Sequence, residues 1–392
     1  MRVYLDHHAT TPVDADVLQA MLPYFSERFG NAASKTHEWG WEADEAVQGA
    51  RERVAALIGA RARDIVWTSG ATESNNLAIQ GVAEFYGERG DHVITAVTEH
   101  NAVLDCCRAM ERAGRTRVTY LPVDGRGRID PDDIRRAITD RTVLVSIMHA
   151  NNEIGTVQPI GEIGAITRER GVLFHTDAAQ SGLLLPIDVD GMNIDLLSLS
   201  AHKMYGPKGC GALFVRGRNP RTRLRAILHG GGHERGMRSG TLNVPGIVGM
   251  GAACELASAR RDADTAFIGT LRDRLQNRLF ERVAGLQLNG DAANRLPGNL
   301  NVGIPYVEGD SLMMALTGIA VSSGSACTSA SLEPSHVLKA IGLAEGLAQG
   351  SIRFGVGRGN TAEEIDFVAD RVSEEVSRLR AMSPEFRRLG EV

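Results

Sequence analysis

Cysteine is scarce in this sequence. The chain has five cysteines among 392 residues, and no two of them are separated by two residues. A small and odd number of cysteines excludes a disulfide framework, and the missing CxxC pairs exclude a zinc ribbon. The composition therefore predicts a protein of a reducing compartment, the cytoplasm.

Long apolar runs and a strong net charge are also missing. No run of about eighteen uncharged apolar residues occurs, and Met1 is followed by a mixed segment without the apolar core of a signal peptide. The formal net charge of -5 offers no general attraction for nucleic acid, so the arginines within residues 216–225 are interpreted as a solvated face. We expect no membrane partner, no direct nucleic-acid partner and no targeting segment.

The chain does have enough apolar material for a large core, because 43% of its residues are hydrophobic, and its length suggests two or three domains. Short apolar runs alternate with longer amphipathic ones, which predicts an α/β fold with a mainly parallel, helix-covered sheet. Strands are expected at residues 65–68, 92–97, 118–123, 142–148, 172–175, 194–199 and 211–215. Helices are expected at residues 43–58, 74–86, 131–138 and 160–170.

Helix signals and a change of pattern mark the later part of the chain. Asp130 can cap a helix that opens with Pro131. Thr361 and Glu364 form a capping box before an apolar pattern at helical spacing, which predicts a helix near the C-terminus. Charges at residues 260–264 follow an apolar stretch, and the alternation is less regular beyond them. We place the start of a second, smaller domain there.

Residues 69–73 (Ser-Gly-Ala-Thr-Glu) follow a predicted strand and open a predicted helix. Backbone amides at a helix N-terminus, with the Thr72 hydroxyl beside them, favour an anion such as a phosphate. The alternative is an ordinary turn in which Ser69 caps the helix. The segment is not a Walker A loop, because the Gly-Lys-Ser/Thr element is missing.

Two residues that follow buried strands could support cofactor chemistry. Asp177 ends a strand at the edge where parallel sheets bind ligands, and a carboxylate there could keep a pyridine nitrogen protonated. Lys203 follows another apolar strand, where a partly buried amine could lose its proton and form a Schiff base. Most lysines are merely solvated, but Ser200 and His202 beside it add hydrogen-bonding groups for a phosphate.

Three further residues have both a chemical and a structural interpretation. His100 could stack on a cofactor ring and move protons, or it could cap a helix. Arg353 stands between apolar neighbours, and either a substrate carboxylate or a structural ion pair could offset its burial. Cys327 lies in a stretch of small polar residues, whereas Cys254 has apolar neighbours in the sequence. We expect Cys327 to be an accessible nucleophile and Cys254 a packing residue.

No metal site is expected. His175 and Asp177 could be two ligands of an iron site, but that chemistry normally needs a β-barrel context, which the predicted parallel sheet does not provide. Residues 230–234 resemble a metallopeptidase motif only superficially, because Met237 stands where the second histidine would be required.

Eight motifs together resemble the cysteine desulfurases of the NifS/IscS type, which are class-V aminotransferase-like enzymes of fold type I that use pyridoxal 5'-phosphate (PLP). The resemblance extends from Tyr4 to about Arg358. The motifs are LDHHATTPVD (residues 5–14), TSGATESNNLAI (68–79), TEHNAVLD (98–105), SIMHANNEIGTVQ (146–158), HTDAAQS (175–181), SAHKMYGPKG (200–209), GGGHERGMRSGT (230–241) and SSGSACTSASLEPS (322–335).

The resemblance implies a fold and a domain plan. Residues 13–258 would form a large PLP-binding domain around a mainly parallel seven-stranded sheet. Residues 1–12 together with 259–392 would form a smaller α+β domain that carries the Cys327 loop. The protein would be a homodimer, in which Thr241 completes the phosphate site of the other subunit.

The resemblance also implies a role for each site residue. Lys203 holds the cofactor covalently, Cys327 accepts the sulfur, and His100 stacks on the cofactor ring. Asp177 pairs with the pyridine nitrogen, and Gln180 contacts the phenolic oxygen. The remaining contacts are the phosphate cup of Ala71, Thr72, Ser200, His202 and Thr241, the carboxylate-binding Arg353, and Asn152 near both substrate and cofactor.

The activity implied is the conversion of L-cysteine to L-alanine with a persulfide left on Cys327, which would pass to an acceptor such as an iron-sulfur scaffold. Leu199 and Ala201 replace the phenylalanine and glycine of the scaffold-binding branch, and residues 383–392 lack its tryptophan-histidine ending. The acceptor therefore stays open. One alternative is another fold type I PLP enzyme, such as an aminotransferase or a selenocysteine lyase. A second is a non-catalytic assembly platform, but such a protein would not need Lys203, Asp177, His100 and Cys327 together.

Overall fold

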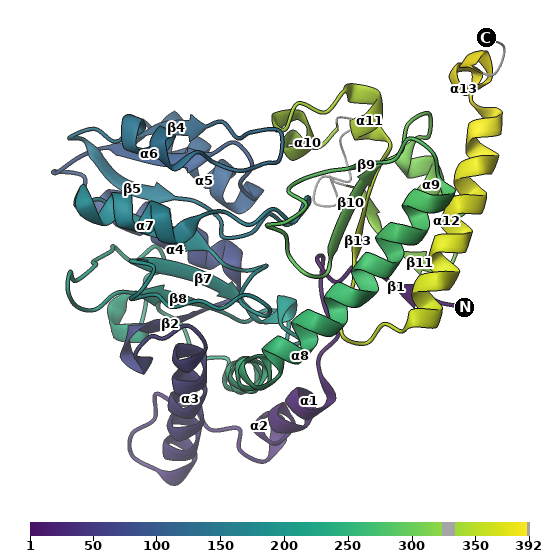
Figure 1. The fold of residues 1–392 in the computed structure, drawn as a ribbon. Coiled ribbons are helices and arrows are strands. Elements are labelled where there is room, and N and C mark those ends of the chain that lie inside the picture. Colours follow the sequence, from purple (N-terminus) through teal and green to yellow (C-terminus); the bar gives the residue numbers. More distant parts are fainter. Residues whose placement is uncertain (324–333, 390–392) are drawn as a thin grey trace.

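A seven-stranded sheet is the centre of the computed structural model, which describes residues 1–323 and 334–389. The strands are β2 (Ile65–Thr68), β3 (His92–Ala96), β4 (Arg117–Leu121), β5 (Thr142–Ser146), β6 (Leu173–Asp177), β7 (Leu196–Ser200) and β8 (Gly211–Val215). Their order is β2-β8-β7-β6-β5-β3-β4 (Figure 1). β8 is antiparallel to both neighbours and the other pairs are parallel, so the predicted mainly parallel sheet is confirmed.

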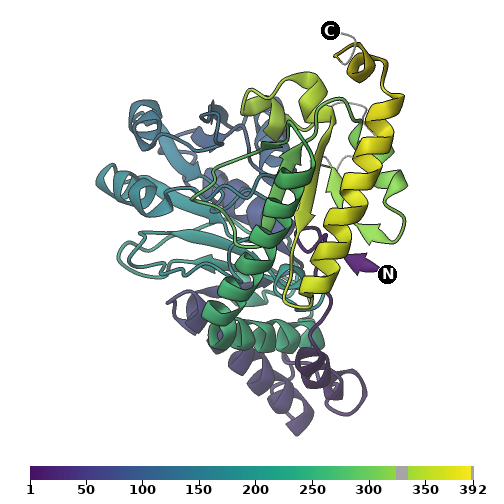
Figure 2. The ribbon, with the colours of Figure 1, turned by 45° about the vertical axis from the view of Figure 1, so that its right-hand side comes forward.

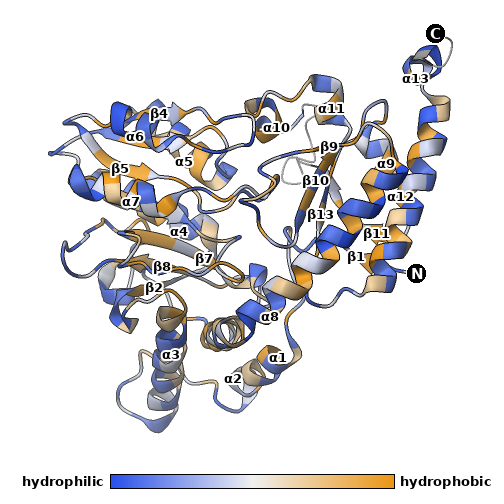
Figure 3. Ribbon diagram, viewed as in Figure 1, coloured by the Kyte–Doolittle hydropathy of each residue, from blue (hydrophilic) through white to orange (hydrophobic). Residues whose placement is uncertain are grey.

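Both faces of this sheet are covered by helices. The covering helices are α3 (Glu38–Leu57), α4 (Ala71–Phe85), α5 (Asn101–Arg112), α6 (Pro131–Ala137) and α7 (Ile160–Glu169). Because strand side chains alternate between faces, Ile94 and Phe174 pack in one apolar cluster with α3 and α7. Their neighbours Val93 and Leu173 pack in another cluster with α4 and α5. This burial explains the continuous apolar strands, which are mostly orange in Figure 3.

A second group of strands lies beside the large sheet. A four-stranded antiparallel sheet has the order β12-β13-β10-β9, and a parallel pair joins β1 to β11. These strands are β1 (Val3–Tyr4), β9 (Gln287–Leu288), β10 (Asn299–Gly303), β11 (Ile319–Ala320), β12 (Ser322–Ser323) and β13 (Ser351–Gly355). The N-terminal strand β1 thus pairs with β11, a strand from the last third of the chain.

One long helix, α8 (Val244–Arg282), connects the two groups of strands. Its beginning packs against α3 and its end against α12 (Ala362–Met382) (Figure 2). The predicted capping box of Thr361 and Glu364 at the start of α12 is confirmed. The boundary expected at residues 258/259 falls inside α8, and the domain division stays a prediction. In the described part of the chain, no helix is both long enough and apolar enough to cross a membrane.

Short helices complete the structure. They are α1 (Ala15–Met21), α2 (Pro23–Ser26), α9 (Gly309–Ala315), α10 (His336–Ala340), α11 (Glu345–Gln349) and α13 (Pro384–Leu389), with 3-10 turns at Ala62–Asp64, Ala201–Lys203 and Glu234–Gly236. Asp130 caps α6 as predicted, accepting a hydrogen bond from the backbone of the first turn. α3 begins five residues before the predicted position, at Glu38, because the His37 ring accepts the N–H of Gly40 and caps the helix.

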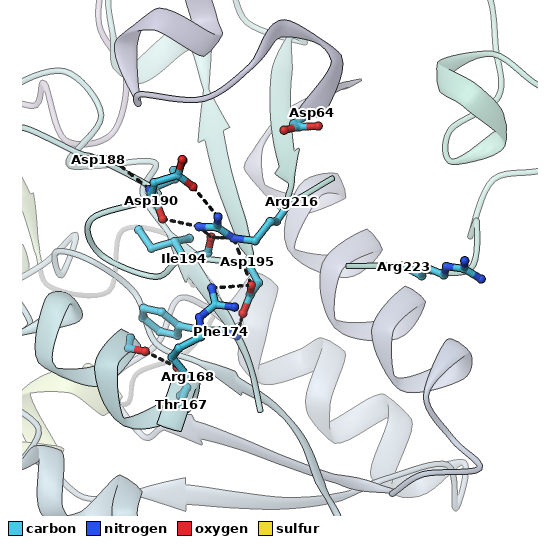
Figure 4. A network of polar contacts seen from close by, with 12 residues as sticks. Asp64, Thr167, Arg168, Phe174, Asp188, Asp190, Ile194, Asp195, Arg216 and Arg223 are labelled. Atoms are coloured by element: carbon cyan, nitrogen blue, oxygen red, sulfur yellow. Dashed lines mark hydrogen bonds and ion pairs between the residues drawn. The ribbon is translucent and has the colours of Figure 1, made fainter. Parts of the chain in front are cut away.

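A buried carboxylate joins the amino ends of β6 and β7 to the carboxyl end of β8. Asp195 accepts the backbone N–H of Phe174 at 3.0 Å and lies 3.2 Å from an Arg168 nitrogen and 3.3 Å from Arg216 Nε (Figure 4). Arg216 also donates to the carbonyl oxygens of Val189 and Ile194. The network stabilises the sheet edge opposite the carboxyl end of β6.

Replacing Asp195 with alanine is expected to lower the free energy of unfolding by about 3 kcal/mol, because it removes the buried carboxylate paired with Arg216 and leaves the buried Phe174 N–H without an acceptor. Asp190 provides a matched control, since it pairs with Arg216 but its side chain is 65% exposed. The Asp190→Ala change is expected to cost less than about 1 kcal/mol. Urea unfolding of both variants checks the difference, and equal losses would contradict it.

Candidate active site

A cavity of about 550 Å³ opens at the carboxyl ends of β6 and β7, the edge where parallel sheets bind ligands. It brings together ten of the predicted site residues, which are Ala71, Thr72, His100, Asn152, Asp177, Gln180, Ser200, His202, Lys203 and Arg353. Thr241 is exposed and does not line the cavity of its own chain. Cys327 lies outside the described residues.

One wall of the cavity is an uncapped helix terminus. α4 begins at Ala71, directly after Gly70, without a side-chain cap, so its first backbone N–H groups lack an intrahelical acceptor. Ser69 is not the cap that the alternative interpretation expected. It donates its backbone N–H to Glu73 Oε2 at 2.8 Å instead. The free amides of α4, with Ser200 in the same cavity wall, can bind a phosphate.

His202 adds an imidazole to the cavity wall. Its Nδ1 lies 3.1 Å from Thr10 Oγ1. Burial, together with the nearby Lys203 and Lys208 cations, lowers the pKa of His202 to about 4. The neutral ring still carries one N–H with which it can donate a hydrogen bond.

Asp177 is held by donors on two sides. Asn75 Nδ2 donates to its Oδ2 at 2.7 Å, and the backbone N–H of Ala179 donates to its Oδ1 at 2.9 Å. Beside it, burial raises the pKa of Glu99 well above its usual range, and the charge of Asp177 adds to the shift. This shift favours the neutral form of Glu99, whereas Asp177 lines the cavity and can accept from a cationic ring nitrogen.

Lys203 meets the N-terminal segment of the chain in the cavity. Its Nζ donates to the carbonyl oxygen of His8 and, at 2.8 Å, to that of Ala9. Gln180 contacts the same segment, because its Nε2 donates to the His8 carbonyl at 3.0 Å. The amine and the amide are thus placed next to each other by backbone acceptors from residues 8 and 9.

His100 caps a helix and also lines the cavity. It is the N-cap of α5, where its Nδ1 accepts the backbone N–H of Ala102 at 3.0 Å, and it also lines the cavity. Because Nδ1 is an acceptor, the ring proton is on Nε2. The cap fixes the ring and leaves its other nitrogen as the one that can donate.

Arg353 makes the structural ion pair and also lines the cavity. It lies on β13, lines the cavity and is 3% exposed. Its Nη2 donates to Asp6 Oδ1 at 2.9 Å, and its Nη1 donates to the carbonyl oxygen of Asn152 at 2.8 Å. The ion pair with Asp6 offsets the burial of the guanidinium and orients it in the cavity.

The four described cysteines are buried and unpaired, and they are Cys106, Cys107, Cys210 and Cys254. Burial raises the pKa of Cys106 to about 11 and that of Cys210 to about 12, and it raises the other two further. Their thiols are therefore protonated and inaccessible, as expected for Cys254.

The candidate iron ligand His175 is a structural residue. Its ring nitrogens lie 2.8 Å from Ser146 Oγ and 3.0 Å from Ser198 Oγ inside the sheet. Within residues 1–323 and 334–389, no group of three His, Cys, Asp or Glu side chains could hold a metal ion.

Sequence reasoning missed several cavity residues. His8, Ala9 and Thr10 line the cavity. They belong to the LDHHATTPVD motif, but they follow no predicted strand, and no role was expected for them. Asn75 and Glu99 contact or flank Asp177 from buried positions. The signal that could have found these two is a polar side chain on the apolar face of a predicted helix or at the end of an apolar strand.

Comparisons with known proteins identify relatives of this chain. The Aminotransferase class-V family model matches residues 3–368. The chain is 61% identical over 382 residues to cysteine desulfurase IscS of Anaeromyxobacter sp. (strain Fw109-5), which covers 97% of this chain and 94% of that relative. A solved NifS-like protein matches with a TM-score of 0.89 and 37% identity over 96% of this chain and 100% of that one. A structure of SspA in complex with cysteine matches with a TM-score of 0.80 and 41% identity over 92% and 100%.

Proposed function

We propose that this chain, which belongs to the class-V aminotransferase family and is a PLP-dependent cysteine desulfurase, transfers the sulfur of L-cysteine to its own Cys327. The observation that supports the assignment is one cavity that joins the Lys203 amine, the Asp177 carboxylate, the uncapped start of α4 and the Arg353 guanidinium. The products would be L-alanine and a persulfide on Cys327. SspA, a similar protein, has been solved with cysteine, which fits this substrate.

The cavity residues fit PLP. The free amides of α4, with Thr72, Ser200 and His202, would hold its phosphate, and Asp177 would pair with its ring nitrogen. Lys203 would hold its aldehyde carbon. When bound, PLP withdraws electrons from the substrate and so acidifies the proton on the substrate α-carbon.

Separate side chains of the cavity then bind the substrate, orient it and transfer its protons. Arg353 binds the α-carboxylate, because its guanidinium faces the cavity from a buried ion pair. Lys203 removes the α-proton as a neutral amine, and His100 donates a proton from Nε2 where one is needed. Asn152, in the cavity wall, orients the substrate beside Arg353.

Cys327 would complete the reaction. Its thiolate attacks the substrate sulfur, the new S–S bond forms, and the substrate C–S bond breaks with its electron pair left on carbon. Protonation of that carbon yields alanine, so L-cysteine and a thiol become alanine and a persulfide without an external oxidant. The four described cysteines are buried and their thiol pKa values are raised, which supports Cys327 as the acceptor.

A homodimer would complete the phosphate site through Thr241. Thr241 is exposed on its own chain, which fits a contact with a second subunit. Large apolar side chains are also exposed around α1, α2 and α3, at one end of the molecule (Figure 1), as expected of an interface. They are Leu18, Leu22, Phe25, Phe29, Trp39 and Trp41.

The persulfide sulfur would pass to an acceptor protein such as an iron-sulfur scaffold in the cytoplasm. The IscS relatives support this proposal at 61% identity, whereas Leu199 and Ala201 differ from the scaffold-binding pattern. Transfer of radiolabelled sulfur from the loaded enzyme to a purified scaffold protein tests the acceptor separately from the reaction.

The reaction itself is tested by its products. Purified yellow protein given L-cysteine and a reductant should release alanine and sulfide in equal amounts. Alanine without sulfide, or neither product, would point to transamination or another PLP reaction and would overturn the proposal.

Substitution of Arg353 by leucine is expected to raise the KM for L-cysteine by about 100-fold, because a charged hydrogen-bonded contact to the carboxylate is worth about 2 to 3 kcal/mol. Cofactor absorbance should be retained. Arg358 is the matched control, since it pairs with Asp14 and stacks on Tyr205 without lining the cavity. Steady-state kinetics check the prediction, and an unchanged KM in Arg353→Leu would contradict it.

A further inference from the structure

We infer that His8 is a positioning residue of the cofactor site, which holds the side-chain amide of Gln180 in one orientation so that its NH2 end serves the phenolic oxygen of PLP. The inference rests on the proposed role of Gln180 at that oxygen. It assigns a function to a residue of the LDHHATTPVD motif for which no role was expected from the sequence.

His8 contacts both ends of the Gln180 amide. Its ring Nδ1 lies 3.0 Å from Gln180 Oε1, and its backbone carbonyl accepts a hydrogen bond from Gln180 Nε2 at 3.0 Å. Because Oε1 can only accept, the ring must carry its proton on Nδ1. Turning the amide by 180° would replace both favourable contacts with repulsive ones, so a single residue fixes which end donates.

The His8 ring is itself held in place. It is 8% exposed and packs against β13, where a Cβ added at Gly355 would lie 3.0 Å from its Cδ2 and 2.8 Å from its backbone nitrogen. The backbone carbonyl of His8 also accepts from Lys203 Nζ. The segment is therefore held against β13, where Gly355 makes room for it.

The surroundings of His8 keep its ring neutral. Burial lowers the pKa of His8 to about 3, and the Arg353, Lys203 and His7 charges act in the same direction, whereas the contact with Gln180 opposes them. The ring then has one N–H, on Nδ1, and Nε2 is a buried nitrogen without a partner in the described part of the structure. An apolar side chain would fill the same space without the cost of burying an unpaired nitrogen. The hydrogen bond from Nδ1 to Gln180 is the interaction that an apolar residue at this position could not make.

The orientation of the amide has a measurable consequence. Gln180 Nε2 has two hydrogens, and one of them is used by the His8 carbonyl. The second can donate to a cofactor oxygen and stabilise negative charge there, which favours the deprotonated form of the bound cofactor. Without the Nδ1 contact only the backbone carbonyl of residue 8 would hold the amide, so its orientation would be less well fixed and this stabilisation would weaken. The pH midpoint of the cofactor's absorbance change would then rise by about one unit, the size expected for one hydrogen bond to a charged group.

The experiment is a pH titration of holoenzyme absorbance without substrate. His8→Leu should raise the midpoint by about one unit, and His8→Asn should restore it, because an asparagine amide can place a donor where Nδ1 was. His7→Leu is the matched control, since His7 is the adjacent histidine and does not contact Gln180 in the described structure. In a Gln180→Leu background, His8→Leu should add no further shift.

An unchanged midpoint in His8→Leu, or a shift that persists in the Gln180→Leu background, would overturn the inference. Should His8→Leu fail to fold, His8→Asn and His8→Gln decide the question. Their amides reach the Nδ1 and Nε2 positions respectively, so only His8→Asn should keep the wild-type midpoint, and equal midpoints would refute the role. Absorbance does not depend on desulfuration, so this outcome is independent of the alanine and sulfide test of the proposed function.

Discussion

Replacing Lys203 with alanine is expected to reduce alanine release from L-cysteine by at least about 10³-fold, because the variant loses both the amine that holds PLP and the base that removes the α-proton. In the structure the Lys203 Nζ is placed by the carbonyl oxygens of residues 8 and 9 in the cavity. Freshly purified variant should also lose its yellow absorbance on gel filtration.

Lys208 is the matched control for this prediction. It also lines the cavity, but its side chain is exposed and it lies beyond the 3-10 turn that carries Lys203. Lys208→Ala is expected to keep the cofactor and most of the activity. Alanine release is measured by amino-acid analysis, and wild-type turnover in Lys203→Ala would remove Lys203 from the reaction.

Replacing Cys327 with alanine is expected to abolish persulfide formation and to reduce sulfide release by at least about 10³-fold, while PLP and substrate binding persist. The physical reason is that the cavity residues bind cofactor and substrate without the thiol, whereas the C–S bond breaks only when a nucleophile takes the sulfur. The absorbance change on adding L-cysteine should therefore remain, without release of product.

Cys106 is a suitable control for the thiol, because it is buried and its pKa is raised to about 11. Cys106→Ala should form the persulfide at the wild-type level. Persulfide is detected by alkylation and mass spectrometry after one turnover. Normal persulfide formation in Cys327→Ala would show that another group accepts the sulfur.

Local patterns in the sequence predict most of the large sheet. All seven expected strands are present, and their ends differ from the predictions by a few residues. Apolar runs are reliable here because both faces of each inner strand are buried. Helix starts were less accurate, since α4 begins at Ala71 with no side-chain cap and α3 depends on the unusual cap His37.

The middle of α8 shows a different limit of local patterns. The charges at residues 260–264 suggested a break between domains, yet α8 continues through them. Asp264 is buried and lies 3.8 Å from Arg358, whereas Asp262, two positions earlier in the helix, is exposed. A charged run can stay helical when its members lie on different faces of the helix.

The sequence by itself determined the α/β class, the positions of the buried strands and the polar residues that end or follow them, among them Asp177 and Lys203. These features depend on periodicity and on neighbours along the chain. Only the tertiary structure decided which distant residues share the cavity. His8 contacts Gln180, which is 172 positions away in the sequence, and Asp6 contacts Arg353, which is 347 positions away. Such contacts depend on how β1 and β13 are brought beside the large sheet, and no local propensity specifies that arrangement.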